Sequence, residues 1–534
     1  MVGRRLKFWG WGYEGDGLED AEVRGLLATF ANVMGIALAN PVAVPEVEEI
    51  DLAKPRIRIP KALAEICTTE PFERLLHTYG QSFPDSARIF ERDFRNAPDI
   101  VAYPRDEAEV AALLDWAGDK GAAAIPYGGG SSVVGGVEPA VGDTYKAAVT
   151  IDTTKLDKVL EIDETSRAAR IQGGALGPRL EAQLKSSGLT LRHFPQSFEH
   201  STLGGWIATR SGGHFATLYT HIDDLVESVR MVTPAGVIES QRLPGSGAGP
   251  SPDRLMIGSE GSLGIVTEAW MRLQGQPRFE ATTGVRFHDF LDAAAAVRAV
   301  AQAGLYPANL CIVDGVELMA NGVGDGSFTL MAVSFESADH PVDAWMDRAL
   351  ECCADHGGEA EADWRESPDA DHDGLAGAWR TAFIRMPYNR EVLTPRAIIS
   401  DTLATSITWD RLEDFHHAVK GAIEQAIRDA TGREGAVSCR FSHAYPDGPA
   451  PTFGFHAEGT PGNMVPDWQA IKDAASDAAI AAGGTITHHH AVGRDHMKWY
   501  EQQRPALVGE ALAAAKQRLD PKGILNPGVV IATP

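Results

Sequence analysis

The sequence predicts an α+β fold built from two main parts. At 534 residues, the chain is long enough for about three domains of ordinary size. Hydrophobic residues make up 44% and charged residues 23%, a globular composition that excludes disordered and collagen-like chains. Up to about residue 275, short strands alternate with helices and glycine-rich turns. Beyond it the amphipathic helices lengthen and glycine clusters become rarer, so we place a domain boundary there.

Charge and cysteine usage narrow the choice of partners and compartment. The net charge is -25, from 48 Lys and Arg against 73 Asp and Glu. Such an acidic surface disfavours nucleic acid and gives no support to peripheral contact with anionic membranes. The five cysteines form no CxxC pair, which argues against a disulfide framework or a zinc site. The chain start does not resemble a signal peptide and no stretch is long enough to span a bilayer, so we expect a cytoplasmic protein.

In the first part, strands and helices follow each other closely. A strand over 100–103 precedes a helix that begins at Asp106, and we expect Asp106 and Glu109 to form a capping box. The helix leads to a strand over 122–125 and then to a glycine loop. Further strands are predicted over 148–151, 159–162 and 168–171, followed by a helix over 178–186 that ends before Gly188. Residues 245–252 are predicted to form a surface loop.

The second part contains longer elements. Apolar periodicity predicts helices over 291–302, 342–356 and 468–482, and strands over 310–313, 328–335 and 452–456. Residues 369–374 imitate the first half of a calcium-binding EF-hand loop. Its twelfth position is Arg380, where a bidentate Glu would be needed, so we interpret the segment as a solvated acidic loop.

The strongest chemical signal is the run Pro126–Gly136 directly after a strand. Glycines let backbone N–H groups converge on an anion such as a pyrophosphate, although a tight surface turn remains an equal alternative for this run alone. No Lys-Ser/Thr follows the glycines and the G-x-G-x-x-G spacing is absent, so P-loop and Rossmann proteins are not supported. Similar clusters at Ser201–Trp206 and Gly258–Gly264 suggest that three loops wrap one extended ligand, such as a dinucleotide.

These motifs resemble the FAD-binding domain of the vanillyl-alcohol-oxidase superfamily, also called the PCMH-type domain. The resemblance rests on Pro126–Gly136, Pro195–Arg210, Met256–Glu268 and the closing motif Leu519–Gly528. It implies an FAD cofactor, which we expect to be bound non-covalently. The cofactor-binding residues that it implies are Pro126, Tyr127, Gly128, Gly129, Gly130, Ser131, Ser132, Pro195, Ser201, Thr202, Gly204, Gly205, Thr209, Glu260, Gly261, Gly264 and Ile265.

Within this superfamily the chain is most similar to the alkyldihydroxyacetonephosphate synthase (alkylglycerone-phosphate synthase) family. The matching runs are 8–13, 383–385, 408–411, 439–445 and 487–493, so the resemblance covers nearly the whole chain. It implies a two-part FAD-binding domain, a cap domain with an antiparallel sheet, and a C-terminal helical segment. We assign residues 1–90 to an N-terminal helical extension and 91–275 to the FAD-binding domain. Residues 276–500 form the cap that carries the Tyr and His motifs, and 501–534 form a C-terminal segment that packs near the flavin.

The resemblance implies a redox-neutral exchange on a small, phosphorylated and lipid-like substrate. In that family, flavin N5 forms an adduct with C1 of acyl-dihydroxyacetone phosphate, the fatty acid leaves, and a fatty alcohol replaces it. Tyr445 would then be the acid and base at C1, and Arg385 would bind the substrate phosphate. His488, His489 and His490 would assist proton transfer. We also expect a homodimer.

Each of these residues has a structural alternative. Tyr445 precedes a turn, and Arg385 could be exposed or paired with Glu391. The three histidines follow a segment that looks like a strand, so His488 and His490 would face one side and His489 the other. They could not all bind one ion in that geometry, and we expect no metal site, with metal binding and purely structural histidines as the alternatives.

The chain departs from the synthase pattern on the substrate side. Gly493 is followed by Arg494-Asp495-His496, Tyr445 by Pro446, and Arg385 by Met386-Pro387, where the proline would disturb a helix. Three functions therefore remain open: the synthase, an FAD oxidase or dehydrogenase of an alcohol or 2-hydroxy acid, and a flavin-binding protein without turnover. Relatives that oxidise 2-hydroxy acids carry one His and a Glu at the triple-histidine position, which favours the synthase.

Overall fold

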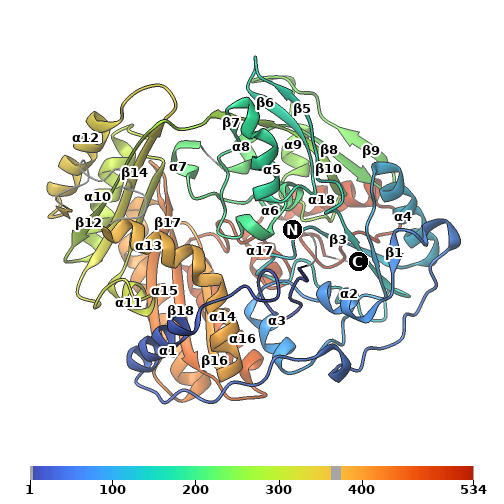
Figure 1. Ribbon diagram of the computed structural model, residues 1–534, viewed down its shortest axis with the longest axis horizontal. Coiled ribbons are helices and arrows are strands. Elements are labelled where there is room, and N and C mark those ends of the chain that lie inside the picture. Colours follow the sequence, from blue (N-terminus) through green and yellow to red (C-terminus); the bar gives the residue numbers. More distant parts are fainter. Residues whose placement is uncertain (1–3, 220, 362–373, 533–534) are drawn as a thin grey trace.

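The strands and helices form two α+β domains, as the sequence predicts. The computed structural model describes residues 4–219, 221–361 and 374–532. Within them, the first domain contains a four-stranded and a five-stranded sheet, and the second domain contains a seven-stranded sheet. In Figure 1 the second domain occupies the left side and the first domain the top and right side. The strands β7 (Leu189–Thr190) and β11 (Gln274–Gly275) form a small additional sheet where the chain leaves the first domain.

The four-stranded sheet carries the glycine loop at its edge. Three of its strands are parallel and buried, which explains their continuous apolar sequence. In order across the sheet the strands are β1 (Cys67–Thr68), β2 (Ile100–Ala102), β4 (Ala148–Asp152) and β3 (Ala123–Tyr127). Helix α4 (Glu107–Lys120) connects β2 to β3. Its N-cap, Asp106, accepts a hydrogen bond from the Glu109 N–H, but the Glu109 carboxylate binds the Arg105 N–H, so only half of the predicted capping box forms.

The five-stranded sheet is antiparallel and supports the other two glycine loops. Its order is β5 (Val159–Asp163), β6 (Ala168–Gln172), β10 (Ile265–Arg272), β8 (Val226–Thr233) and β9 (Gly236–Glu239). Helix α5 (Gly177–Leu184) continues as a 3-10 turn over Lys185–Ser187 and stops at Gly188, whose φ of 69° suits glycine. The short helices that follow are α6 (Leu203–Thr209), α7 (Ala216–Tyr219), α8 (Ile222–Leu225) and α9 (Pro252–Met256).

The second domain is a seven-stranded antiparallel sheet. Its order is β15 (Glu359–Ala360), β12 (Phe279–Phe287), β14 (Thr329–Ser337), β13 (Asn309–Val313), β17 (Ala436–Ala444), β18 (Pro449–Glu458) and β16 (Ile398–Ala404). Four amphipathic helices bury one face of the sheet in the largest core of the described residues. They are α10 (Phe290–Gln302), α12 (Asp343–Ala354), α15 (Leu412–Thr431) and α16 (Met464–Ala481).

The opposite face of this sheet contributes to the functional site. Side chains alternate along β13, so Leu310 and Ile312 enter the large core, whereas Cys311 and Val313 join a separate cluster with Trp379. Trp379 belongs to α13 (Gly374–Arg385), and α11 (Gly315–Ala320) packs beside it. The 3-10 turn at Met386–Tyr388 contains Pro387, and α13 ends directly before it, as the sequence predicts. Helix α14 (Asn389–Leu393) follows.

The N-terminal 90 residues are distributed over both domains. Strand β1 joins the four-stranded sheet, α2 (Pro71–Leu76) packs near it, and α3 (Phe83–Phe90) inserts Phe83 and Ala87 into the core of the second domain. Helix α1 (Asp20–Met34), blue in Figure 1, packs on the second domain near α11. This region therefore joins the domains and has no large core of its own.

The C-terminal segment returns to the first domain. Helices α17 (Met497–Gln503) and α18 (Ala506–Leu519) precede an extended end in which the Ile524 carbonyl accepts from the Ala124 N–H of β3. All five cysteines are free thiols. Among the helices described, none is both long and apolar enough to cross a bilayer. Most of the acidic segment 369–374 lies outside the described residues.

Candidate active site

The first glycine loop leaves β3 and fits closely against the second loop. A Cβ on Gly128 would lie 2.3 Å from the Thr202 hydroxyl, and one on Gly129 would lie 1.7 Å from the His200 carbonyl oxygen. Gly130 has a φ of +67°, and a Cβ there would lie 2.0 Å from the Tyr127 hydroxyl. Close backbone approach therefore requires glycine at Gly129, whereas at Gly128 and Gly130 the space for a Cβ is taken by the Thr202 and Tyr127 side chains.

The third loop is joined to the other two by packing and by the closing motif. A Cβ on Gly261 would lie 2.7 Å from Pro126. The Asn526 amide donates to the Gly136 carbonyl at 3.0 Å and to the Glu260 carbonyl at 2.7 Å. The Glu260 carboxylate accepts the backbone N–H groups of Val492 and Gly493, which follow the three histidines. The structure thus brings together three loops that are far apart in the sequence.

A cavity of about 230 Å³, which we call the interdomain cavity, lies between the first two glycine loops and the second domain, whereas the third loop lines a separate cavity. Its second-domain wall comes from β13, α13, β17 and the histidine segment. The predicted site residues that line it are Gly128, Gly129, Gly130, Ser131, Ser132, Pro195, Ser201, Thr202, Gly205, Thr209, His489 and His490.

Other predicted cofactor residues lie behind the wall. Tyr127 is buried and its hydroxyl donates to the Leu76 carbonyl, while the Gly204 N–H donates to Gly173. Ile265 begins β10 in the core, and a Cβ on Gly264 would touch Met231. Pro126, Gly261 and Glu260 connect the loops, and Glu260 also lines a second cavity of about 710 Å³.

A bulge in β17 directs His443 toward the interdomain cavity. Val437 and Cys439 enter the large core, and Arg440 lies on the cavity face, as a period of two requires. The register with β18 shifts between Phe441 and His443. The extra residue reverses the alternation, so His443 lines the cavity and Ala444 enters the core.

Tyr445 follows directly and lies between two imidazoles. Its hydroxyl is 2.7 Å from Nε2 of His488 and also hydrogen-bonds Nε2 of His221. The Tyr445 N–H donates to the Gly448 carbonyl, and Trp409 donates from its indole to the Tyr445 carbonyl at 3.0 Å, so the backbone is fixed on both sides. His488 and His221 line the second cavity, and Tyr445 lines neither the interdomain nor the second cavity.

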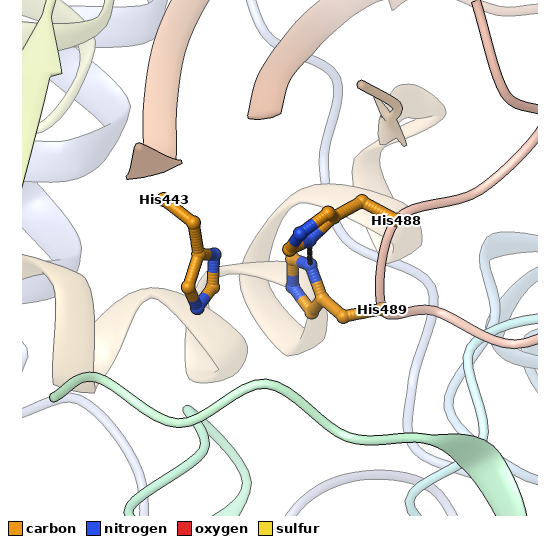
Figure 2. Close-up of side chains that lie close together, drawn as sticks. All are labelled: His443, His488 and His489. Carbon is orange, nitrogen blue, oxygen red and sulfur yellow. Dashed lines mark hydrogen bonds between the residues drawn. The ribbon is translucent and has the colours of Figure 1, made fainter. Parts of the chain in front are cut away.

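The triple-histidine segment is not a strand, and the predicted alternation is wrong. The chain bends there, and Nδ1 of His488 hydrogen-bonds Nδ1 of His489 at 2.9 Å. Figure 2 shows these two rings side by side, facing His443 from the end of β17. Ligand atoms of the three imidazoles lie within 4.8 Å of one another, so His488 and His489 could share an ion with His443. Their existing hydrogen bonds favour a proton relay instead.

Burial sets the protonation states of this group. It lowers the pKa values of His443, His488, His489 and His490 well below the ordinary value of 6.5. Neighbouring imidazoles add to the effect for the first three, and Lys472 followed by His496 does so for His490. Burial, followed by the nearby Asp447 and Asp223, raises the pKa of Tyr445. At neutral pH the phenol is therefore protonated and the imidazoles are neutral, so each His can accept a proton.

Arg385 lies at the end of α13 and is engaged by the N-terminal segment. Its guanidinium pairs with Glu22 of α1 at 2.6 Å and donates to the Gly17 carbonyl at 2.7 Å. It is absent from the residues that line the interdomain and second cavities. The structure therefore does not bring it to the site, because α13 ends there. The alternative partner Glu391 binds Lys7 instead.

Several residues of the site were not predicted. His221 carries no sequence signal of its own, since it precedes a short helix. Arg440 and His443 lie in the matching run 439–445, but the resemblance implies a role there for Tyr445 alone. Trp11 and Phe383 belong to matching runs and line the cavity from the N-terminal segment and from α13.

Two family models match most of the chain. Residues 98–240 match an FAD binding domain, and residues 276–530 match the C-terminal domain of FAD linked oxidases. The first range contains the first two glycine loops, and the second contains Arg440, Tyr445 and the three histidines.

Similar proteins cover nearly the same span. An alkyldihydroxyacetonephosphate synthase of Dictyostelium discoideum is 30% identical over 477 residues, covering 86% of this chain and 77% of that protein. One of Trypanosoma brucei brucei is 26% identical over 511 residues, covering 92% and 81%. A solved structure of an alkyldihydroxyacetonephosphate synthase superposes with a TM-score of 0.81 at 25% identity, covering 98% of both chains.

Proposed function

This chain belongs to the alkyldihydroxyacetonephosphate synthase family of FAD-dependent enzymes, and from that premise we propose that it exchanges the acyl group of an acyl-dihydroxyacetone phosphate for a fatty alcohol. The ester bond between C1 and the acyl oxygen breaks, and an ether bond from C1 to the alcohol oxygen forms. The alcohol proton leaves with the fatty acid. No electrons are gained or lost.

The described loops fit FAD. The glycines at 128–130 leave no side chain between the backbone and the cavity, and Ser131, Ser132 and Thr202 add hydroxyl groups on the same wall. Such a surface suits a pyrophosphate. The apolar wall made by Phe194, Trp206 and others suits a flat ring. When bound, FAD would supply an electrophilic ring that can bond reversibly to a substrate carbon.

The observation that carries the proposal is the buried hydroxyl of Tyr445 between two neutral imidazoles. Tyr445 takes a proton from the substrate carbon while it passes its own proton to Nε2 of His488. In the matching tautomer, Nδ1 of His488 then donates to Nδ1 of His489, which lines the interdomain cavity. The relay works in both directions, as an acid and base acting at one carbon requires.

Burial serves the relay in a second way. A tyrosine in water would lose its proton only near pH 10, and burial raises the pKa of Tyr445 further. A free phenolate is therefore not the base. Because His488 accepts the proton as Tyr445 receives another, the phenol never carries a full negative charge.

An FAD-linked oxidase or dehydrogenase is the second candidate, because residues 276–530 match that family model. The same Tyr445 and His488 would take the hydroxyl proton of an alcohol or 2-hydroxy acid while two electrons pass to the cofactor. The two reactions differ in electron balance, which makes them separable.

The test is anaerobic addition of substrate to purified holoprotein. We expect a flavin absorption spectrum before addition, and release of fatty acid from acyl-dihydroxyacetone phosphate and fatty alcohol with no net flavin reduction. Lasting bleaching by glycolate or D-lactate, with dye reduction and no ether product, would show the oxidase instead. A protein that stays colourless after reconstitution with FAD would contradict both.

A further inference from the structure

Arg440 gives the interdomain cavity its fixed positive charge. It lies on the cavity face of β17 and is only 7% exposed. Of the described residues that line this cavity, Arg440 is the only Lys or Arg, and none is Asp or Glu. An anionic group that enters the cavity therefore meets one permanent cation and no fixed negative charge on the wall.

The guanidinium is held from one side and leaves a donor open. Its Nη1 pairs with the Glu317 carboxylate, which also accepts from the Ser438 hydroxyl at 3.0 Å. Within the described part of the chain, Nε of Arg440 is buried without a hydrogen-bond partner. A buried N–H without a partner is unfavourable, so the site is incomplete without an acceptor.

Glu317 contacts Arg440 from outside the interdomain cavity. Glu317 lines a side cavity of about 130 Å³, which Arg440 also lines, but it does not line the interdomain cavity. The carboxylate thus holds the guanidinium without itself lining the interdomain cavity. Asn309, Ser442 and His490 line the interdomain cavity as well and offer neutral hydrogen-bonding groups.

Two other arginines near this region contact other groups, although Nε of Arg385 is, like Nε of Arg440, buried without a hydrogen-bond partner among the described residues. Arg385 binds Glu22 and the Gly17 carbonyl. Arg390 donates to the Gln81 carbonyl and pairs with Asp401 at 3.3 Å. Neither lines the interdomain cavity.

We propose that Arg440 binds the phosphate monoester of the substrate, with Glu317 as its positioning residue. The inference rests on the proposed function, which supplies a phosphorylated three-carbon headgroup. An arginine fork matches phosphate geometry and keeps its charge at every working pH. Binding there places the phosphate beside His490, and therefore at the same cavity wall as the His489 end of the relay.

The experiment compares Arg440→Lys, Arg440→Met, Glu317→Gln and Arg385→Met as holoproteins. Calorimetry and the flavin difference spectrum report the binding of dihydroxyacetone phosphate and of inorganic phosphate. We expect Arg440→Met to weaken both by about a hundredfold and Arg440→Lys by about tenfold, at unchanged FAD content. Glu317→Gln keeps an acceptor for Arg440 but loses the ion pair that orients it, so it should weaken phosphate binding, by less than Arg440→Lys does. Arg385→Met should change affinity less than twofold.

The inference would be overturned by wild-type phosphate affinity in Arg440→Lys or by loss of affinity in Arg385→Met instead. Loss of FAD from Arg440→Lys would overturn it as well, because it would assign the guanidinium to the cofactor. Arg440→Lys keeps a cation for Glu317, so it tests the fork even if Arg440→Met does not fold. Arg440-dependent binding of glycolate or D-lactate without phosphate binding would also overturn it. Phosphate binding that needs Arg440 without any acyl exchange would contradict only the proposed function.

Discussion

At the scale of single residues, the hydroxyl of Tyr445 is the atom on which the proposed chemistry depends. It is buried, bonded to His488 and His221, and fixed by backbone contacts on both sides. Phenylalanine would keep the ring and its packing while removing the proton.

We expect Tyr445→Phe to retain FAD but to lower kcat for exchange about 10²–10⁴-fold, the usual contribution of a positioned acid or base. Tyr219→Phe is the matched control, because the Tyr219 hydroxyl only meets Glu336 at 3.5 Å. Steady-state exchange rates and the FAD-to-protein absorbance ratio measure the two effects. A near-normal rate in Tyr445→Phe would remove Tyr445 from the mechanism.

The raised pKa of Glu260 makes the stability of the protein depend on pH. Burial raises its pKa from 4.5 to about 7, although the N–H groups of Val492 and Gly493 oppose the shift. Its ionisation is therefore harder in the folded protein than in the unfolded chain. The associated stability is fully present below pH 4.5 and is lost as the pH rises through 7, by up to about 3 kcal/mol.

The side chain introduced by Glu260→Gln cannot ionise, so this variant does not lose that stability as the pH rises. Whatever the substitution costs at pH 5, we expect the melting temperature of Glu260→Gln relative to the wild type to improve between pH 5 and pH 8. Thermal denaturation of both proteins in matched buffers measures it. A gap that stays constant or widens with pH would contradict the raised pKa.

At the scale of elements, the glycine loops are defined by what they touch. Gly129 and Gly130 leave no room for a side chain because the His200 carbonyl and the Tyr127 hydroxyl occupy the position of the missing Cβ. Any side chain there would separate loops that together form one wall of the cavity.

We expect Gly129→Val and Gly130→Val each to strip FAD from an otherwise folded protein. Gly25→Val in α1 is the control, since a Cβ there meets nothing within 4 Å. Flavin absorbance of the purified proteins and their circular dichroism separate loss of cofactor from unfolding. Full flavin content in either loop variant would refute the loop assignment.

The helices with strong apolar periodicity are the elements that the sequence predicts well. The helices of the second domain have strong apolar periodicity, and α10, α12 and α16 match their predicted ranges within a few residues at each end. The sequence did not predict the bend at the three histidines, because a short β-prone run resembles a strand. The nearby residues Val492 and Gly493 donate their backbone N–H groups to the Glu260 carboxylate. The β17 bulge leaves no mark in the sequence either.

At the scale of the whole molecule, the N-terminal segment connects elements that are distant in sequence. Lys7 is buried and pairs with Glu391 at 2.6 Å, and the Trp11 N–H donates to the same carboxylate at 2.7 Å. Trp11 then lines the interdomain cavity. The pair therefore positions part of the cavity wall.

We expect Lys7→Met to destabilise the protein by about 2–3 kcal/mol, because it leaves the Glu391 carboxylate buried without its cation. The double variant Lys7→Met with Glu391→Gln should be less destabilised, since the amide oxygen can still accept from Trp11. Denaturant unfolding of the two variants measures the difference. Equal losses would show that the pair contributes little.

The sequence by itself determined the α+β class, the glycine motifs, the family resemblance and therefore the FAD cofactor, because these depend on residue types at short spacing. It also singled out Tyr445 and the three histidines. Only the tertiary structure decided that Arg385 is bound to Glu22 and that His221 and His443 join the site. It also decided that Arg440 is the only Lys or Arg among the described residues that line the interdomain cavity. These contacts join residues up to several hundred positions apart, and packing of two domains, not local sequence, selects among many arginines and histidines.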